Sequence, residues 1–321
     1  MKKNLLSIII PTYKRLNLLM ETIESINKQT YNNIEIIVID DDPNSNNEKE
    51  LYNIPNVIYK KNTKNLNAGM SRNVGYNLSD GEYIIFCDDD DIYTDKNFFN
   101  DAVEIFNKNS NVDIILANSD IWCVKENIII DTNLNCVGTI SGKEYLKNFQ
   151  MKYNKPNSTF PTIFRKEVLD KADFENMKMM NDTPIYLRAL TYSNDVYIYE
   201  KKVGKYRVHS VNISYNLASD FIIENLNEKI KTYNNNSYLE QKWIDNQTFI
   251  TVSYFFNGSN PNKDEKNNIY AWIKENSNNY RNIIKKIKFY NFKHCLKKLI
   301  KGENAVMKTK TKVTLVSFFL S

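Results

Sequence analysis

The chain has 321 residues, of which 42% are hydrophobic and 25% are charged, and its formal net charge at pH 7 is +5. This composition is ordinary for a soluble globular protein with room for one large domain and an appendage. The longest apolar stretch near either end, residues 313–320, is interrupted by Thr314 and Ser317 and is too short to cross a bilayer, and we find no secretory signal at the start. The cysteines follow neither a metal-ligand nor a disulfide spacing, which favours a reducing cytosol (Cys87, Cys123, Cys136 and Cys295).

The first third of the chain alternates strand-like and helix-like patterns. Short runs of β-branched and aromatic residues predict strands, and apolar residues at helical spacing between them predict helices. Because the connections are short, this order favours an α/β fold with a mostly parallel sheet. The expected strands are 5–10, 34–39, 57–59 and 83–87, and the expected helices are one through Leu19, Ile23 and Ile26, then 69–78 and 96–108.

The next hundred residues are more mixed, and the strand signals fade after about Asp220. Asp182-Thr183-Pro184 is a helix-start signal, because a capping residue precedes a proline in the first turn. We therefore expect a boundary near residue 220, followed by polar helices. The other expected elements are strands at 114–117, 196–199 and 203–208, a hairpin at 122–130, and helices at 142–150 and 166–172.

Four consecutive aspartates, Asp88–Asp91, directly follow the apolar run 83–87. Adjacent carboxylates repel one another, so either water or a cation must stabilise them. An exposed acidic turn is the simplest interpretation of such a run. This run, however, ends a buried strand, where open α/β sheets place their ligands, and it contains neither Gly nor Pro. It therefore predicts a divalent-metal site whose carboxylate oxygens suit Mg²⁺ or Mn²⁺.

Two other segments are expected at the same edge of the sheet. Pro11-Thr12-Tyr13 leaves the first strand, and Asp40–Asp42 ends the second. If these strands are parallel neighbours, an aromatic face, a carboxylate acceptor and a metal site lie together. A nucleotide-diphosphate ligand needs these features for stacking, for a hydrogen bond to its base, and for neutralising its phosphates.

Four ordered motifs resemble those of family 2 glycosyltransferases with a GT-A fold. They are Ser7–Tyr13 (SIIIPTY), Glu35–Asp41 (EIIVIDD), Ser71–Gly75 (SRNVG) and Gly81–Asp91 (GEYIIFCDDDD). The resemblance covers residues 5–100 and extends more weakly to about Ser214. It implies a GT-A, Rossmann-like mixed sheet that is mainly parallel and flanked by helices, with a C-terminal helical region. The domains it implies are a catalytic domain over 1–219, with a nucleotide-sugar-binding half 1–118 and an acceptor-side half 119–219, and a helical region over 220–321.

The resemblance implies roles in nucleotide binding for five residues. Asp41 matches the acid that accepts a hydrogen bond from the uracil imide of a UDP-sugar. Pro11, Thr12 and Tyr13 match the segment that lines the base, and Arg72 matches an arginine that reaches the nucleotide. Taken alone, Arg72 fits a solvated helix residue better than a ligand, and the acids beside Asp41 fit turn formers better than ligands.

The aspartate run matches the D-x-D motif of the same family. Asp88 corresponds to the acid near the ribose and a metal-bound water, Asp90 to the metal ligand, and Asp91 to an acid near the donor sugar. Asp89 lies between them in the nucleotide-sugar site. Asp89 and Asp91 form a second overlapping D-x-D register, but the first keeps the family's distance from Phe86.

Some positions depart from the family pattern. The usual Asp-Asp-Gly-Ser turn is replaced by Asp41-Asp42-Pro43-Asn44, which still turns but changes the local backbone. The Gln-x-x-Arg-Trp signature and the membrane spans of processive synthases are absent. The resemblance therefore implies an enzyme that adds one sugar per encounter.

Asp182 is the candidate general base. Met180-Asn181-Asp182 resembles the family's Glu-Asp pair, with Asn181 in place of the Glu. In an inverting transfer, a carboxylate takes the proton of the acceptor hydroxyl while a metal stabilises the leaving diphosphate. Asp182 also fits a helix cap, in which case Asp173 and Glu175 are the next candidates.

His209 follows the last expected strand, where the family often has a histidine near the metal or diphosphate. It is therefore a candidate metal ligand. A single histidine at a strand end is also compatible with no special role.

The C-terminal segment 281–321 is strongly basic. Eleven Lys or Arg and one acid, Glu303, give residues 281–312 a charge of +10, so the rest of the chain carries −5. Phe292, Cys295, Leu296 and Leu299 share one helical face and lysines share the other, which predicts an amphipathic helix on an anionic membrane surface. The alternative is a helix docked on the acidic body of the protein.

These observations predict an inverting glycosyltransferase that uses Mn²⁺ or Mg²⁺. It would move a hexose or N-acetylhexosamine from a UDP-sugar to a hydroxyl of a glycan or lipid-linked glycan, in cell-surface polysaccharide or glycolipid biosynthesis. We expect it in the cytoplasm, at the inner face of the cell membrane, without a nucleic-acid partner. A nucleotidyltransferase of similar architecture should carry a Gly-rich phosphate loop after its first strand, and residues 11–16 lack glycine. A catalytically silent nucleotide-binding scaffold would be expected to lose the acids that are intact here.

Overall fold

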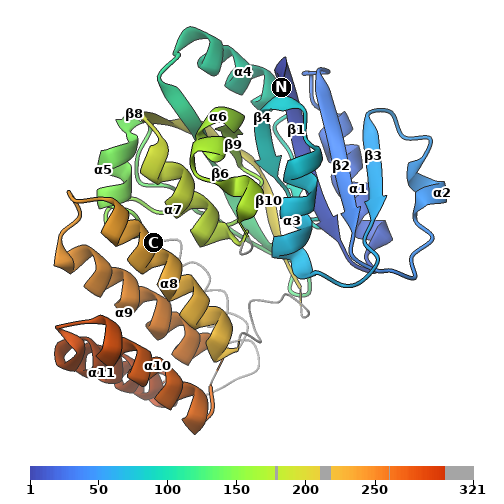
Figure 1. Ribbon diagram of the computed structural model, residues 1–321. Helices are drawn as coiled ribbons and strands as arrows, with labels where there is room; N and C mark the ends of the chain where they lie inside the picture. The colour runs from blue at the N-terminus through green and yellow to red at the C-terminus, as the bar shows by residue number, and fades with distance from the viewer. Residues whose placement is uncertain (178–179, 210–217, 260, 301–321) are drawn as a thin grey trace. The chain divides into compact units, whose positions relative to one another are not determined.

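The structure is a computed structural model that describes residues 1–177, 180–209, 218–259 and 261–300 (Figure 1). The chain divides into two compact units. The first contains Met1–Trp122, Ile129–Leu146 and Lys155–Arg207. The second contains Cys123–Ile128, Lys147–Asn154 and the described residues from Val208 onward. The domain division expected from the sequence stays a prediction.

One mixed sheet organises the first unit. Across it the strands follow the order β3-β2-β1-β4-β9-β6-β10-β5, with β7 beside β6 and β8 beside β10. The neighbours β3, β2, β1 and β4 are parallel, whereas β9 is antiparallel to both β4 and β6. The bounds are β1 Lys2–Thr12, β2 Ile34–Asp40, β3 Val57–Lys61, β4 Gly81–Phe86, β5 Ile92–Tyr93, β6 Val112–Cys123, β7 Ile128–Ile130, β8 Gly138–Ser141, β9 Thr162–Arg165 and β10 Asp195–Val208.

Helices cover both faces of the parallel part of this sheet (Figure 1). Successive strand residues point to opposite faces. Ile8 of β1 therefore joins the core that also contains apolar residues of α1 and α4, whereas its neighbour Ile9 faces α3. The helices of this unit are α1 Leu16–Asn27, α2 Glu48–Leu51, α3 Asn67–Leu78, α4 Phe98–Lys108, α5 Gly142–Lys147, α6 Lys166–Lys171, the short 3-10 helix η1 Phe174–Asn176 and α7 Asp182–Tyr192.

Gly75 explains how closely α3 lies on the sheet. A Cβ atom at this position would come within 2.4 Å of Ile9 Cγ2 and 3.3 Å of Ile39 Cγ1. Any larger residue would push α3 away from β1 and β2. The close packing fixes α3, and with it Arg72, beside the carboxyl end of the sheet.

The second unit contains a helical bundle. Its core includes Leu226, Phe255 and Ile273, together with Ile283 and Ile287 of α11. Among the described helices, none is both long enough and apolar enough to cross a membrane. The helices of this unit are α8 Ser219–Asn235, α9 Gln241–Gly258, α10 Lys263–Asn276 and α11 Tyr280–Ile300.

Several elements differ from the sequence expectation. The two strands expected at 196–199 and 203–208 are one continuous strand, β10. The short strands β5, β8 and β9 were not predicted, and the helix expected over 142–150 ends at Lys147. These strands have two to four residues, too few for an alternating pattern to reveal them.

Candidate active site

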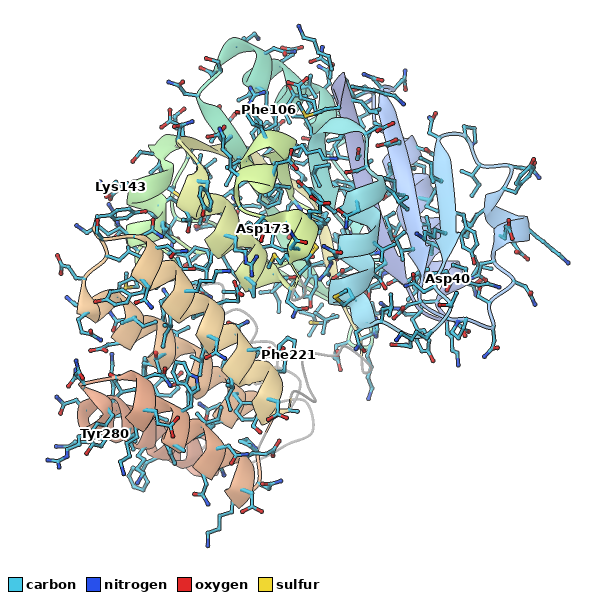
Figure 2. All side chains as sticks on the ribbon, in the orientation of Figure 1. Asp40, Phe106, Lys143, Asp173, Phe221 and Tyr280 are labelled. Carbon is cyan, nitrogen blue, oxygen red and sulfur yellow. The ribbon has the colours of Figure 1, made fainter. Side chains whose placement is uncertain are left out.

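Three segments meet at the carboxyl ends of β1, β2 and β4. Asp41 N–H donates a hydrogen bond to the carbonyl oxygen of Thr12 at 2.8 Å, which joins the ends of β1 and β2. The Thr12 hydroxyl donates to Asp89 Oδ2 at 2.7 Å, which joins β1 to the aspartate run after β4. Figure 2 shows Asp40 at this edge, at the opposite end of the sheet from Phe106. The convergence follows from the parallel pairing of β1 with both of its neighbours.

Asp41 is buried, and one of its two carboxylate oxygens is already used. Oδ1 accepts hydrogen bonds from Asn62 Nδ2 at 2.9 Å and from the Leu66 N–H at 2.8 Å. Oδ2 makes no hydrogen bond within the described part of the chain. Two donors therefore fix the carboxylate plane and leave one oxygen for a further donor. Asp40, next to it, is a structural residue that accepts from Asn47 and Tyr59.

Arg72 is not a solvated helix residue. Its side chain is 5% exposed, and Nη1 donates to the carbonyl oxygen of Met180 at 2.7 Å. Nη2 forms an ion pair with Asp88 Oδ1. Arg72 therefore connects α3, the start of the aspartate run and the segment before α7.

The aspartate run is largely buried, which excludes the exposed acidic turn. Asp89 and Asp91 have no exposed surface and Asp90 very little, while Asp88 keeps 29% of its side chain exposed. Arg15, which the sequence analysis did not single out, partly balances this charge. Its Nη2 lies 2.5 Å from Asp89 Oδ1 and its Nη1 lies 2.9 Å from Asp90 Oδ2.

Burial raises the pKa of two acids of the run, Asp89 and Asp91. It raises the pKa of Asp89 to about 7, although Arg15 and the Thr12 hydroxyl oppose the rise. Burial, and then repulsion by Asp88 and Asp90, hold the pKa of Asp91 well above its usual range. Asp91 Oδ2 accepts from Ser158 Oγ at 2.8 Å, and its Oδ1 is buried with no hydrogen-bond partner among the residues that the structure describes.

Asp182 is the first residue of α7 and not its cap. The cap position is Asn181, whose side chain makes no capping hydrogen bond. Lys155 Nζ lies 3.9 Å from Asp182 Oδ2. Burial raises the pKa of Asp182, and the positive charges of Lys155 and then Arg72 oppose this effect. The next candidates for the base, Asp173 and Glu175, are exposed.

The remaining predicted residues are placed as follows. Pro11 lies within β1 opposite Ile39, and Tyr13 is 43% exposed just beyond the strand. The ammonium of Lys14 lies over the Tyr13 ring, 5.0 Å from its centre. His209 belongs to the second unit, and its role as a metal ligand stays a prediction.

The donor chemistry of the aspartate run fits a divalent cation. Asp88 and Asp90 present carboxylates at a strand end, and Mg²⁺ or Mn²⁺ is often held by one or two carboxylates together with water and substrate phosphates. Within the described ranges, no three His, Cys, Asp or Glu side chains converge on one metal position. The described protein groups therefore supply only part of a coordination shell, and metal binding is a proposal.

The sequence analysis did not identify four residues of the site: Arg15, Asn62, Lys155 and Ser158. Asn62 directly follows β3, so the rule that marks strand ends also points to it. Arg15 closely follows the Pro11–Tyr13 segment, but it is 74 residues from Asp89, and no local pattern pairs the two. No local pattern marks Lys155 or Ser158, because their partners lie far away in the sequence.

Comparisons with known proteins identify the family of this chain. Residues 7–172 match the family described as glycosyl transferase family 2. An uncharacterized glycosyltransferase of Methanocaldococcus jannaschii is 26% identical, over 80% of this chain and 85% of its own. A putative colanic acid biosynthesis glycosyl transferase of Escherichia coli, WcaA, is 39% identical, over 29% of this chain and 36% of its own.

Among solved structures, the chain is similar to S. aureus TarS, residues 1–349, crystallised with UDP-GlcNAc. The TM-score is 0.65 at 18% sequence identity, over 87% of this chain and 83% of TarS 1–349. At this identity the likeness concerns the fold alone. The α/β GT-A fold predicted from the sequence is confirmed.

Proposed function

The chain belongs to glycosyl transferase family 2 and is a glycosyltransferase, and we propose that it moves a hexose or N-acetylhexosamine from a UDP-sugar to a hydroxyl of a glycan acceptor, with inversion at the anomeric carbon. Family membership decides against the nucleotidyltransferase alternative. One observation supports this proposal most directly. The buried Asp41 uses Oδ1 for two internal hydrogen bonds and has Oδ2 left for a ligand, next to the aspartate run that follows β4. That TarS was crystallised with UDP-GlcNAc supports the choice of donor.

The donor would bind along the carboxyl edge of the sheet. Asp41 Oδ2 would accept the uracil N3–H, and the exposed ring of Tyr13 would border the base. Arg72 is held by Asp88 and the Met180 carbonyl, so its charge is fixed where it can attract the diphosphate. Asp89 and Asp91 would complete the nucleotide-sugar site from the buried side.

A divalent cation, Mn²⁺ or Mg²⁺, would be held by Asp90, with Asp88 nearby. When bound, such an ion neutralises negative charge on the departing diphosphate. The protein's own contribution is to keep these acids together through Arg15 and Arg72.

Asp182 would be the general base. Inversion requires the acceptor hydroxyl to attack from the face opposite the leaving UDP, so the base must lie on the acceptor side of the donor. Asp182 stands at the start of α7, and nearly a third of its side chain is exposed, so a hydroxyl can approach its carboxylate. The carboxylate would take the hydroxyl proton as the glycosidic bond forms.

The base assignment is tested with Asp182→Asn. The variant should bind UDP with unchanged affinity and melt at nearly the wild-type temperature, while sugar transfer to a panel of simple aryl glycosides falls about 10²–10⁴-fold. Asp173→Asn is the matched control, because that acid is exposed, and it should retain full activity. Near wild-type transfer by Asp182→Asn would exclude Asp182 as the base.

The acceptor is proposed to be a cell-surface polysaccharide or glycolipid precursor, reached by a protein held at an anionic inner membrane face. Phe289 and Phe292 of α11 are 58% and 60% exposed, and Lys293 lies 4.5 Å from the centre of the Phe289 ring. Exposed aromatic rings among lysines suit the interface of an anionic bilayer. The WcaA match, in a protein named for colanic acid biosynthesis, supports the polysaccharide context.

Vesicle flotation tests the membrane proposal. The full chain should bind vesicles containing phosphatidylglycerol, not pure phosphatidylcholine vesicles, and the double variant Phe289→Ser/Phe292→Ser should bind weakly. Binding should fall with salt, since charges are screened within about 10 Å at 0.1 M. Equal binding to both vesicle types, or to neither, would refute the proposal.

A further inference from the structure

Lys155 occupies a defined place beside the proposed base. It lies in the segment before β9, and its side chain is only 11% exposed. Its Nζ donates to the carbonyl oxygen of Pro156 at 2.9 Å and lies 6.0 Å from the centre of the Tyr186 ring. Tyr186 follows Asp182 by four residues on α7, so both lie on one face of that helix. The ammonium is thus anchored by groups other than Asp182.

The distance between the Lys155 ammonium and the Asp182 carboxylate is longer than in a hydrogen-bonded ion pair. At 3.9 Å, Nζ and Asp182 Oδ2 are beyond hydrogen-bonding distance. The ammonium therefore acts on the carboxylate by its charge and does not occupy the lone pairs that a substrate proton needs. Within the described chain, Asp182 is the only carboxylate that lies within 4 Å of the Lys155 ammonium.

The other charges near Asp182 do not replace Lys155. Burial raises the pKa of Asp182, and Lys155 is the strongest opposing influence. Arg72 also opposes the rise, but its guanidinium is paired with Asp88, whose own charge acts in the reverse direction. Among the described residues, the charged and titratable groups that interact with Asp182 are Lys155, Arg72, Asp88, Asp91, Tyr186 and Tyr206. Burial lowers the pKa of Lys155 itself, and the negative charge of Asp182 opposes this effect.

We propose that Lys155 is a positioning residue for the sugar-transfer reaction, whose fixed ammonium keeps the Asp182 carboxylate ionised and ready to accept the hydroxyl proton. The inference rests on the proposed role of Asp182 as general base. A protonated Asp182 cannot take a proton, so only the ionised fraction of the enzyme is active. Without the nearby positive charge, ionisation of this partly buried carboxyl requires a higher pH.

The test is the pH dependence of kcat/KM in full-length variants, measured from pH 5 to 9 by sugar transfer. Lys155→Met should move the acidic limb of the profile upward by about one pH unit, so that activity near the foot of the limb falls about tenfold. The activity should return to within about twofold of wild type on the alkaline plateau. Lys155→Arg keeps the charge and should keep the wild-type limb. Lys147→Met, at an exposed position, is the matched control.

Other outcomes overturn the proposal. A loss by the same factor at every pH would assign Lys155 a purely structural role, and an unchanged profile would make it a bystander. If Lys155→Met does not fold, Lys155→Gln provides the same uncharged comparison, and an unshifted limb in that variant refutes the proposal. Full activity in Asp182→Asn would refute the base assignment itself, whereas an inactive Asp182→Asn with an unshifted Lys155→Met profile refutes only the role of Lys155.

Discussion

Asp41→Asn is the substitution that tests base recognition most sharply. Asn62 Nδ2 and the Leu66 N–H both donate to Oδ1 of Asp41, at 2.9 and 2.8 Å. An asparagine would turn its carbonyl oxygen toward these two donors and so place its NH₂ group where Oδ2 stands. The variant therefore keeps the local fold and replaces an acceptor with a donor at the uracil N3–H.

The magnitude follows from the kind of hydrogen bond that is lost. A hydrogen bond to a charged group contributes about 1.5–3 kcal/mol. The Kd for UDP should therefore rise roughly 10- to 150-fold, measured by isothermal titration calorimetry. Cytosine presents an acceptor at N3 where uracil has a donor, so the variant should bind CDP better relative to UDP than the wild type does.

Asp42→Asn is the matched control for this experiment. Asp42 is also buried, and its carboxylate accepts from the backbone N–H of Asn44 within its own turn. This control should bind UDP as the wild type does. Wild-type UDP affinity in Asp41→Asn, with no change in preference toward CDP, would refute the assignment of Asp41 to the base.

Two further predictions concern the aspartate run. EDTA should stop sugar transfer, and added Mn²⁺ or Mg²⁺ should restore it. Asp90→Asn should remain inactive after the metal is added, without a large change in melting temperature. Undiminished transfer in EDTA would contradict the metal proposal. In EDTA, the stability of the wild type should fall between pH 5.5 and 8, because a carboxyl whose pKa is raised to about 7 contributes stability at low pH that is lost as the pH rises through that value. In Asp89→Asn, the fall in the free energy of unfolding between pH 5.5 and 8 should be smaller by about 2 kcal/mol, measured by urea unfolding. An unchanged dependence of the unfolding free energy on pH would show that Asp89 is not the group responsible.

The convergence of Thr12, Asp41 and the aspartate run could be predicted, because each ends a strand that local pattern reveals. Parallel pairing of β1 with β2 and β4 then brings these ends together without further information. The family and the GT-A fold followed from the motifs at these same strand ends.

The burial and pairing of the acids could not be predicted in the same way. Arg72 is 108 residues from Met180, whose carbonyl oxygen it contacts, and Arg15 is 74 residues from Asp89. Such contacts depend on how α3 and the turn after β1 pack on the sheet, which periodicity does not specify. For this reason the sequence alone could not show that Arg72 is buried, and it did not point to Arg15.

The basic segment shows a similar limit. Phe292, Cys295, Leu296 and Leu299 were expected to form one membrane-facing stripe. In α11, Ile283 and Ile287 are buried in the helical bundle, whereas Phe289 and Phe292 are exposed. The described part therefore has two apolar faces with different environments. Leu296 and Leu299 lie outside the described side chains, as do residues 301–321.

The central claim is that this glycosyltransferase uses a UDP-sugar, and nucleotide release from a panel of donors tests it most directly. The purified chain, with Mn²⁺ and a mixture of simple aryl glycosides as acceptors, should release UDP from at least one UDP-hexose or UDP-N-acetylhexosamine. Under the same conditions it should leave GDP- and CMP-sugars largely intact. Faster release from a GDP- or CMP-sugar than from every UDP-sugar would contradict the account.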